Sequence, residues 1–311
     1  MAATIDLTTV LDDESPQSEK DVVRIFEDAL NSSGDPTTTT DRIIDDLREF
    51  LRTSDSEYEA DGMLWSLWMV LLAMVMIVPI DHPWQRVFID VVEGLRRRGG
   101  PVTEAENIRG DRIVWDDLPN LRMYVFDKFA DPSDLEDCDL EHIAAWKSFN
   151  RFVCLLLTPE FMQWTIIPYW IIPPGLETPP EDEIEFEIKL WVATEWLIQG
   201  APFLYREMTS TRPLYEEEKR TTAPGPLCKD VPGVSLQRWA FWHSRLSEIA
   251  KTKTFTKVSA TGSSEQAEFS DESYSRVAQA IAALDAAEKA SKEDKGDGGA
   301  ASRQADVPTE E

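Results

Sequence analysis

The sequence predicts an all-α fold, an irregular multi-helix bundle around a central buried helical hairpin, with disordered termini. Three observations indicate this fold. Residues 62–80 form an uncharged apolar run, and residues 84–98 repeat their apolar side chains at helical spacing. Further amphipathic segments of helical period lie on both sides.

Apolar runs and helix-breaking residues between 62 and 98 predict the central hairpin. Residues 62–80 place apolar side chains on every side of a helix, which is typical of a helix buried all round or of a membrane span. Pro79 ends this helix, and either Asp81 or His82 can cap the next one, with Pro83 in its first turn. The second helix carries one apolar stripe, made of Trp84, Val87, Phe88, Val91, Val92 and Leu95.

A membrane anchor through residues 62–80 is the alternative to a core helix. Acidic residues flank the run, namely Glu57, Glu59, Asp61 and Asp81, and the first basic residue after it is Arg86. The basic flank that orients membrane spans is therefore missing. We expect the run to be a core helix and membrane association to be disfavoured.

The other helices follow from apolar spacing and capping residues. Proline and glycine mark most of their limits. The expected ranges are 18–30, 40–51, 119–129, 140–157, a short helix at 160–164, 181–198, 203–208, 235–249 and 271–290. We expect residues 166–174, which contain three prolines, to be an extended packed loop, and residues 209–234 to be a long surface loop.

The composition predicts one domain with different material at its ends. All eleven Trp lie between Trp65 and Trp242. We expect residues 1–17 to be disordered, residues 18–250 to form a single helical domain, and residues 251–311 to be a polar tail with a helix at 271–290.

The charge restricts the classes of partner. The formal net charge is −27, and residues 1–61 contain 17 acidic and 5 basic side chains. Nucleic acid is therefore not expected as a partner. Three Cys without CxxC spacing indicate a reducing compartment, and the acidic N-terminus does not resemble a signal peptide. We expect an intracellular protein, cytoplasmic or nuclear.

Few residues are candidates for chemistry. The phosphate-binding, nucleophile-elbow and zinc signatures are missing, so no cofactor-binding or metal site is expected. Asp81 beside His82 could tune a general base, and these two are the candidate catalytic residues. Helix capping is the simpler interpretation. His142 at an acidic helix start fits no metal-ligand spacing, and His243 is expected to be a packed histidine.

Charged and aromatic runs also have structural interpretations. We expect the acids between Glu181 and Glu187 to form a solvated helix face, with Glu185 and Lys189 at ion-pair spacing. Arg96, Arg97 and Arg98 suit a helix C-terminus. The Trp pairs at helical spacing indicate core packing first and an aromatic ligand pocket second.

Several motifs together resemble a known family. They are Trp65-Ser66-Leu67-Trp68, the turn Pro79-Ile80-Asp81-His82-Pro83, the segment from Trp115 to Pro119, a helix with Trp146 and Asn150, and the helix Leu236-Gln237-Arg238-Trp239-Ala240-Phe241-Trp242. In this order they resemble the fungal domain of unknown function 3632 family, over roughly residues 40 to 250. The resemblance implies a helical, intracellular fungal protein and supplies no catalytic residues. This chain departs from it at Leu71, Leu72, Ala73 and Met74, where charged residues are usual, which keeps the membrane alternative open.

Three functional hypotheses follow. The leading one is a soluble intracellular helical scaffold or protein-interaction module, which binds a protein partner or a small apolar ligand. The second is an enzyme of unrecognised type with a Trp-lined cleft near Asp81 and His82. The third is a protein anchored to a membrane through residues 62–80. Missing catalytic signatures favour the first, and the sequence does not indicate the oligomeric state.

Overall fold

A computed structural model describes most of the chain. It covers residues 5–32, 35–104, 112–129, 138–157, 166–252, 254–258 and 264–301. The predicted helix at 160–164 lies outside these residues. The chain forms two compact units, Met1–Leu156 and Leu157–Glu311. The expectation of a single domain over residues 18–250 stays a prediction, and each unit is described by itself below.

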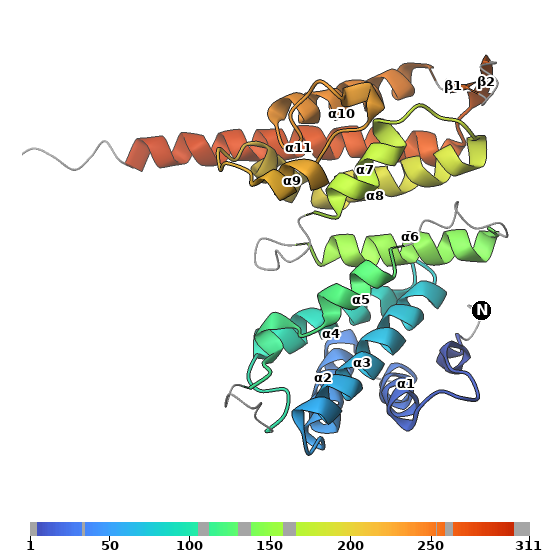
Figure 1. Ribbon diagram of the computed structural model, residues 1–311, viewed down its shortest axis with the longest axis vertical. Helices are drawn as coiled ribbons and strands as arrows, with labels where there is room; N and C mark the ends of the chain where they lie inside the picture. The colour runs from blue at the N-terminus through green and yellow to red at the C-terminus, as the bar shows by residue number, and fades with distance from the viewer. Residues whose placement is uncertain are drawn as a thin grey trace, which may run out of the picture. The chain divides into compact units, whose positions relative to one another are not determined.

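The first unit is a bundle of α-helices, drawn from blue to green in Figure 1. Its elements are η1 (Leu7–Val10), α1 (Gln17–Leu30), α2 (Pro36–Arg52), α3 (Glu57–Ile77), α4 (Pro83–Arg98), η2 (Trp115–Asp117), α5 (Leu121–Asp127) and α6 (Leu140–Leu155). The predicted helices at 18–30, 40–51, 119–129 and 140–157 all correspond to these elements. The all-α fold class is confirmed.

Helix α3 is the core helix of this unit. Leu67, Leu71 and Met74 are 0% exposed. These three residues share one face of the helix, at i, i+4 and i+7 spacing. Helix α3 packs against α1, α2, α5 and α6, so neighbouring helices cover it. By length and composition alone, α3 is also the one described helix that could cross a membrane, a test that buried core helices pass as well.

The predicted hairpin is formed by α3 and α4. The helices contact each other at the turn, while along its length α4 packs mainly against α2 and also against α6. Phe88 on α4 meets Phe26 on α1 edge to face, with ring centroids 5.7 Å apart. The hairpin is therefore central because other helices pack onto both of its arms.

Part of the predicted disordered N-terminus is ordered. Residues Leu7–Val10 form a 3-10 helix that Asp6 caps, because the Asp6 carboxylate accepts a hydrogen bond from the Thr8 N–H. Leu7 is buried, and η1 packs against α3. One apolar side chain in an acidic segment is enough to dock it. Residues 1–4 lie outside the described residues.

The second unit is also helical, with one small hairpin. Its elements are α7 (Pro168–Leu176), α8 (Glu183–Met208), α9 (Glu216–Thr221), η4 (Pro226–Cys228), α10 (Leu236–Thr252), β1 (Thr254–Val258), β2 (Ser264–Glu268) and α11 (Asp271–Ala301). Helices α8 and α11 lie side by side, and α10 packs on α11 (Figure 1). The predicted helix at 271–290 is confirmed as part of α11.

The expected loop at 166–174 is wrong, because α7 occupies it. Pro168 stands at the first helical position, where a missing N–H costs nothing. Pro173 and Pro174 fall near the end of the helix, and the burial of Tyr169, Ile172 and Leu176 compensates for the hydrogen bonds they remove.

The predicted end of the next helix at Ile198 is wrong as well. Helix α8 continues through Gly200 and Pro202 to Met208. A proline inside a helix costs about 3 kcal/mol. Burying Phe203, Leu204 and Met208 repays roughly 1.5–3 kcal/mol for each side chain.

The antiparallel pair β1–β2 was not predicted. Phe255 on β1 faces Ala267 on β2 in the register, and its ring lies 4.9 Å from both Phe186 and Phe269. Phe255 is buried, so this aromatic cluster anchors an otherwise polar hairpin to α8. The expected surface loop at 209–234 also contains order, namely α9 and η4.

Candidate functional site

The turn between α3 and α4 carries the predicted catalytic pair. His82 is the N-cap of α4, and its Nδ1 accepts a hydrogen bond from the Trp84 N–H at 3.3 Å. The two rings pack edge to face, with centroids 4.9 Å apart. Pro83 follows at the first helical position. The capping interpretation of His82 is therefore what the geometry supports.

Two buried polar side chains fix this turn. The Gln85 Nε2 donates to the Val75 carbonyl at 2.9 Å and to the Val78 carbonyl at 2.7 Å. The Ser148 hydroxyl of α6 also donates to Val78 O, at 3.2 Å. These bonds satisfy carbonyls that the end of α3 leaves without a helical partner. They tie the turn to both α4 and α6.

Asp81 points to a different partner from His82. Its carboxylate pairs with Arg151 of α6 at 3.6 Å, and its side chain is 90% exposed. Among the described contacts, none joins Asp81 to the His82 ring. The sequence predicted that these adjacent residues could act as a pair, whereas in the structure each side chain contacts a different partner. Their catalytic role stays a prediction.

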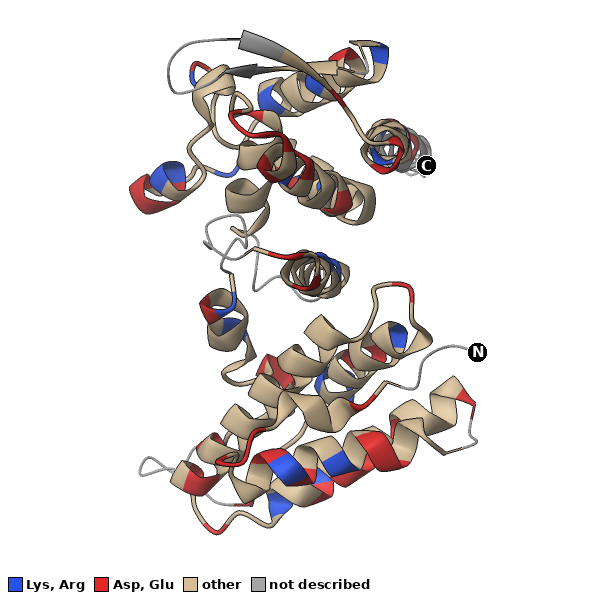
Figure 2. Cartoon of the chain, turned by 90° about the vertical axis from the view of Figure 1, so that its right-hand side faces the viewer, with Lys and Arg blue, Asp and Glu red and all other residues tan. Residues whose placement is uncertain are grey.

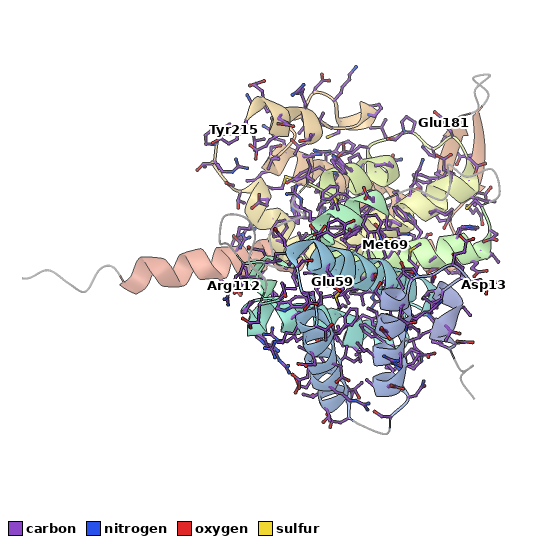
Figure 3. All side chains as sticks on the ribbon, turned by 60° about the horizontal axis from the view of Figure 1, so that its bottom comes forward. Asp13, Glu59, Met69, Arg112, Glu181 and Tyr215 are labelled. Carbon is purple, nitrogen blue, oxygen red and sulfur yellow. The ribbon has the colours of Figure 1, made fainter. Side chains whose placement is uncertain are left out.

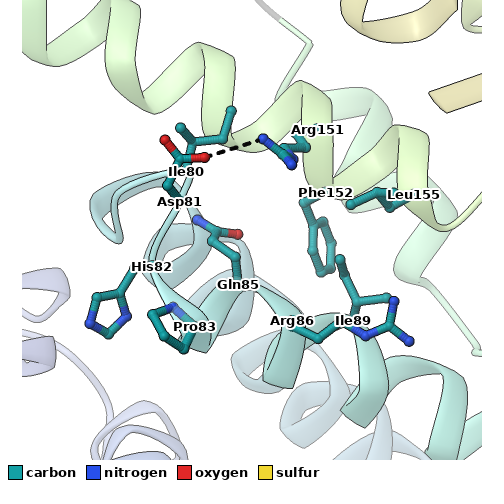
Figure 4. A pocket seen from close by; sticks show the side chains of 10 residues that line it. All are labelled: Ile80, Asp81, His82, Pro83, Gln85, Arg86, Ile89, Arg151, Phe152 and Leu155. Carbon is teal, nitrogen blue, oxygen red and sulfur yellow. Dashed lines mark ion pairs between the residues drawn. The ribbon is translucent and has the colours of Figure 1, made fainter. Parts of the chain in front are cut away.

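A hollow of about 370 Å³ lies beside this turn. Aliphatic and aromatic side chains and two arginines surround it, and Figure 4 shows Arg86 and Arg151 approaching it from different helices. Its lining consists of Ile80, Asp81, His82, Pro83, Gln85, Arg86, Ile89, Arg151, Phe152 and Leu155. No Trp is among them, so this hollow is not the Trp-lined cleft that the enzyme hypothesis expects.

The hollow combines apolar walls with positive charge. Ile89 and Phe152 are almost fully buried. Arg86 pairs with Asp90 at 2.7 Å and keeps 67% of its side chain exposed. Such a site suits an anion that has an apolar body. Within the described part of the chain, no group of three or more His, Cys, Asp or Glu could hold a metal ion.

The second unit holds a polar centre that sequence reasoning missed. Arg238 of α10 and Glu177, which follows α7, are both fully buried. The Arg238 Nε donates to Glu177 Oε1 at 2.6 Å and its Nη2 donates to Glu177 Oε2 at 3.0 Å. The Trp242 Nε1 also donates to Glu177 Oε1, at 2.6 Å.

The expected surface loop closes over this buried pair. Arg238 Nη1 donates to the carbonyls of Thr222 and Gly233, both at 2.7 Å. The Gly225 N–H donates to Glu177 Oε2 at 2.5 Å. A side chain at Gly225 or Gly233 would collide with the Glu177 or Thr222 backbone. Removing either charge would leave its partner buried and uncompensated, which typically costs about 3–5 kcal/mol.

The surroundings of this centre keep its other groups neutral. Burial, and then the Glu177 carboxylate, raise the pKa of the Cys228 thiol to about 11. Burial raises the pKa of Tyr169 well above its ordinary value. The Cys228 thiol is therefore a poor nucleophile near neutral pH. This centre has the character of a structural core, and the sequence signal for it is the Arg inside the Leu236–Trp242 motif.

The remaining candidate histidines have local partners. His142 lies against Asp139, with Nδ1 2.8 Å from Oδ1, and Asp139 caps α6. His243 Nε2 lies 2.9 Å from Asp285 Oδ1, between α10 and α11. Neither shares a site with His82 among the described contacts, which agrees with the structural interpretations given to both.

The charged runs are also accounted for by the fold. Asp182 caps α8, and Glu185 pairs with Lys189 as predicted. Arg98 pairs with Asp41 and Asp45 of α2, at 2.6 and 2.5 Å. The arginines at the end of α4 therefore include an interhelical ion-pair residue as well as dipole partners.

Comparison with known proteins agrees with the motifs. Neither the curated proteins nor the solved structures include a significant match. A family profile, described as a protein of unknown function (DUF3632), matches residues 68–246. The match contains both the His82 turn and the Arg238 helix, the two motifs whose geometry is described above. It spans more than half of the sequence, and the chain therefore belongs to the DUF3632 family.

Proposed function

We propose that this protein is a non-enzymatic helical binding module. Its ligand site is the hollow beside the α3–α4 turn, and its ligand is a small carboxylate with an apolar body. The observation that carries the proposal is that partly exposed apolar side chains, Ile80 and Leu155, line the same hollow as the guanidinium groups of Arg86 and Arg151.

The charge around the hollow supports a carboxylate. The chain is strongly acidic, yet two arginines approach this one hollow. Each of their ion pairs has one exposed side chain, Arg86 at 67% in the pair with Asp90 and Asp81 at 90% in the pair with Arg151, and pairs near the surface contribute only about 0–1 kcal/mol. A bound carboxylate can therefore replace them. The planar guanidinium matches a carboxylate in two-pronged geometry.

The volume of the hollow limits the size of its ligand. Small-molecule sites typically measure about 300–1,000 Å³, so this hollow is near the lower end. A small carboxylate such as octanoate is therefore a suitable probe, because a site of this size takes only a small ligand.

The positions of Asp81 and His82 favour binding over the enzyme alternative. His82 uses Nδ1 to cap α4, and Asp81 turns to Arg151. A general base needs an orienting partner and a reacting group within hydrogen-bond reach. In the described contacts, these two residues are engaged in holding the turn.

The same proposal places the protein in solution inside a fungal cell. The burial of Leu67, Leu71 and Met74 favours a core helix over the membrane anchor. Cys154 and Cys228 are buried and are not joined by a disulfide, which suits a reducing compartment. The fungal setting follows from the family resemblance.

Octanoate and its neutral counterpart octanamide test this function. We expect octanoate to bind the full chain, measured by calorimetry and by amide chemical-shift changes around residues 80–89 and 151–155. Octanamide is expected to bind at least about tenfold more weakly, because a hydrogen bond to a charged group contributes about 1.5–3 kcal/mol.

Arginine variants locate the site. Arg151→Gln and Arg86→Gln are each expected to weaken octanoate binding about tenfold. Arg24→Gln is the matched control, since Arg24 is an exposed arginine of the same unit paired with Asp21 and outside the hollow. Equal affinity for octanoate and octanamide, or equal binding by all three variants, would contradict the proposal.

A further inference from the structure

An aromatic surface with two carboxylates lies where α3 meets α5. Trp65 is 49% exposed and Met123 is 48% exposed. The Trp65 ring stands edge to face against Tyr124, with centroids 4.9 Å apart and planes at 80°. This leaves the indole of Trp65 half open to solvent on a helix that is otherwise a core element.

Fixed contacts hold this surface in place. The Trp68 Nε1 donates to the Pro119 carbonyl at 2.7 Å, and the Asn120 amide donates to Asp61 Oδ1 at 2.5 Å. Both bonds join α3 to the chain just before α5. Trp65 and Tyr124 are therefore presented by two helices whose separation is set by buried or paired groups.

Two carboxylates lie near Tyr124. Burial, followed by the carboxylates of Asp61 and Asp127, raises the pKa of Tyr124. Two acidic groups are thus close enough to the Tyr124 hydroxyl to disfavour its ionised form. Among the described residues, no cation lies over the Trp65 ring.

Two other places in this protein combine an aromatic ring with a carboxylate, and in each of them an arginine is bound. In the second unit, the Arg276 guanidinium lies 3.8 Å from the Trp191 ring centroid and pairs with Glu195. Arg238 lies 5.4 Å from the Trp242 ring and pairs with Glu177. In both places an aromatic ring and a carboxylate hold one arginine.

We propose that the surface formed by Asp61, Trp65, Tyr124 and Asp127 binds an arginine side chain from a basic segment of a partner protein. The guanidinium stacks on Trp65 and pairs with Asp61 and Asp127, while Met123 contacts a neighbouring apolar side chain of the partner. This surface is separate from the carboxylate-binding hollow, and the inference does not depend on the proposed function.

The charge of the whole chain favours this partner. The chain has 58 acidic and 31 basic side chains, which gives a net charge of −27. Figure 2 shows acidic residues on many of its helices. A field of this sign attracts basic segments and speeds their encounter with the protein. Trp is also enriched among residues that dominate binding energy at interfaces.

Selection from a random displayed-peptide library on the immobilised full chain is the test. We expect the enriched peptides to carry Arg beside an apolar residue, and replacing that Arg by citrulline to weaken binding at least tenfold. Trp65→Leu and the double variant Asp61→Asn with Asp127→Asn are expected to weaken binding at least tenfold. Asn at position 61 can still accept the Asn120 hydrogen bond, so the fold is retained.

The matched control is Trp170→Leu, because Trp170 is a comparably exposed tryptophan on α7. It is expected to bind the same peptides as the unaltered protein. Enrichment of peptides without a cation, unchanged affinity in Trp65→Leu, or failure to enrich any peptide would each overturn the inference. Circular dichroism melts of every variant identify a loss of binding that comes from unfolding.

Discussion

At the scale of single residues, polar side chains in this protein mostly hold backbone ends in place. His82 caps α4, Gln85 satisfies the carbonyls at the end of α3, and Arg238 reaches two loop carbonyls as well as Glu177. A buried polar group costs free energy unless it is hydrogen-bonded. These residues therefore specify the path of the chain at positions where helices begin or end.

His82 offers the residue-scale prediction. Substituting an N-cap residue by Ala typically costs about 0.5–2 kcal/mol. We expect His82→Ala to lower the free energy of unfolding by that amount, because the Trp84 N–H loses its acceptor. His82→Asn is expected to recover most of the loss, since its side-chain oxygen can accept the same bond. Urea denaturation followed by circular dichroism measures both.

The same variants separate capping from chemistry. Octanoate affinity is expected to fall less in His82→Ala than in Arg86→Gln or Arg151→Gln, because His82 lines the hollow but is not a proposed anion partner. An unchanged free energy of unfolding together with lost binding would assign His82 to the ligand and contradict its role as a cap.

At the scale of elements, polar contacts at three successive turns of α8 join it to α11 and to Ser270, the residue before α11. Glu187 accepts from the Ser270 N–H and hydroxyl at 2.8 and 2.7 Å, and Trp191 Nε1 donates to Glu272 at 2.6 Å. Glu195 pairs with Arg276. The apolar side chains Val277 and Leu284 are buried beside these contacts. Helix α11 is thus part of the core of the second unit.

Because α11 is docked, we expect a core substitution in it to destabilise the protein strongly, although α11 lies in the segment that was expected to be a polar tail. Leu284 is fully buried, and a buried Leu→Ala change costs about 2–5 kcal/mol. We expect Leu284→Ala to lower the free energy of unfolding of the full chain by this amount, measured by urea denaturation.

Truncation after Glu293 is the matched control. The described contacts of α11 with the rest of the unit extend to Glu288, which accepts from the Trp239 indole at 2.9 Å. The shortened chain is therefore expected to unfold like the full one. If Leu284→Ala changed the free energy of unfolding by less than about 0.5 kcal/mol, the usual range for surface sites, α11 would not be docked.

At the scale of the whole molecule, local signals predicted most helices and few of their pairings. The apolar stripes of α1, α2 and α4 and the apolar run of α3 are local patterns, so these helices could be recognised. Helix α7 and the end of α8 could not, because burial in the finished fold overrides their prolines. The Glu177–Arg238 pair joins residues 61 positions apart, a distance over which spacing carries no signal.

The candidate site divides in the same way. The Asp81-His82-Pro83 turn was visible because capping is a local property. The hollow was not, since Arg151, Phe152 and Leu155 come from α6 and meet α4 only in the folded unit. Trp65 was predicted as core, and the structure leaves it half exposed, with its ring packed edge to face against Tyr124 of α5.

The prediction for the whole molecule concerns helix α3. If other helices surround α3, the protein is a soluble bundle, and if lipid surrounds it, the protein is a membrane protein. Met69, labelled in Figure 3, is partly exposed, whereas Leu71 two residues later is fully buried. We expect Leu71→Lys to prevent folding, because it buries an unpaired charge. Met69→Lys is expected to remain soluble and folded, since its ammonium group can reach water.

Fractionation without detergent and thermal melts measure both variants beside the unaltered chain, which is expected in the soluble fraction. In a lipid-spanning helix, lysine at either position would cost about 2.5–3.5 kcal/mol near the centre, and the two variants would behave alike. Equal damage by both lysines, with the unaltered chain recovered only in detergent, would assign α3 to the membrane. A clear difference between neighbouring positions is what a helix covered by α1, α2, α5 and α6 requires.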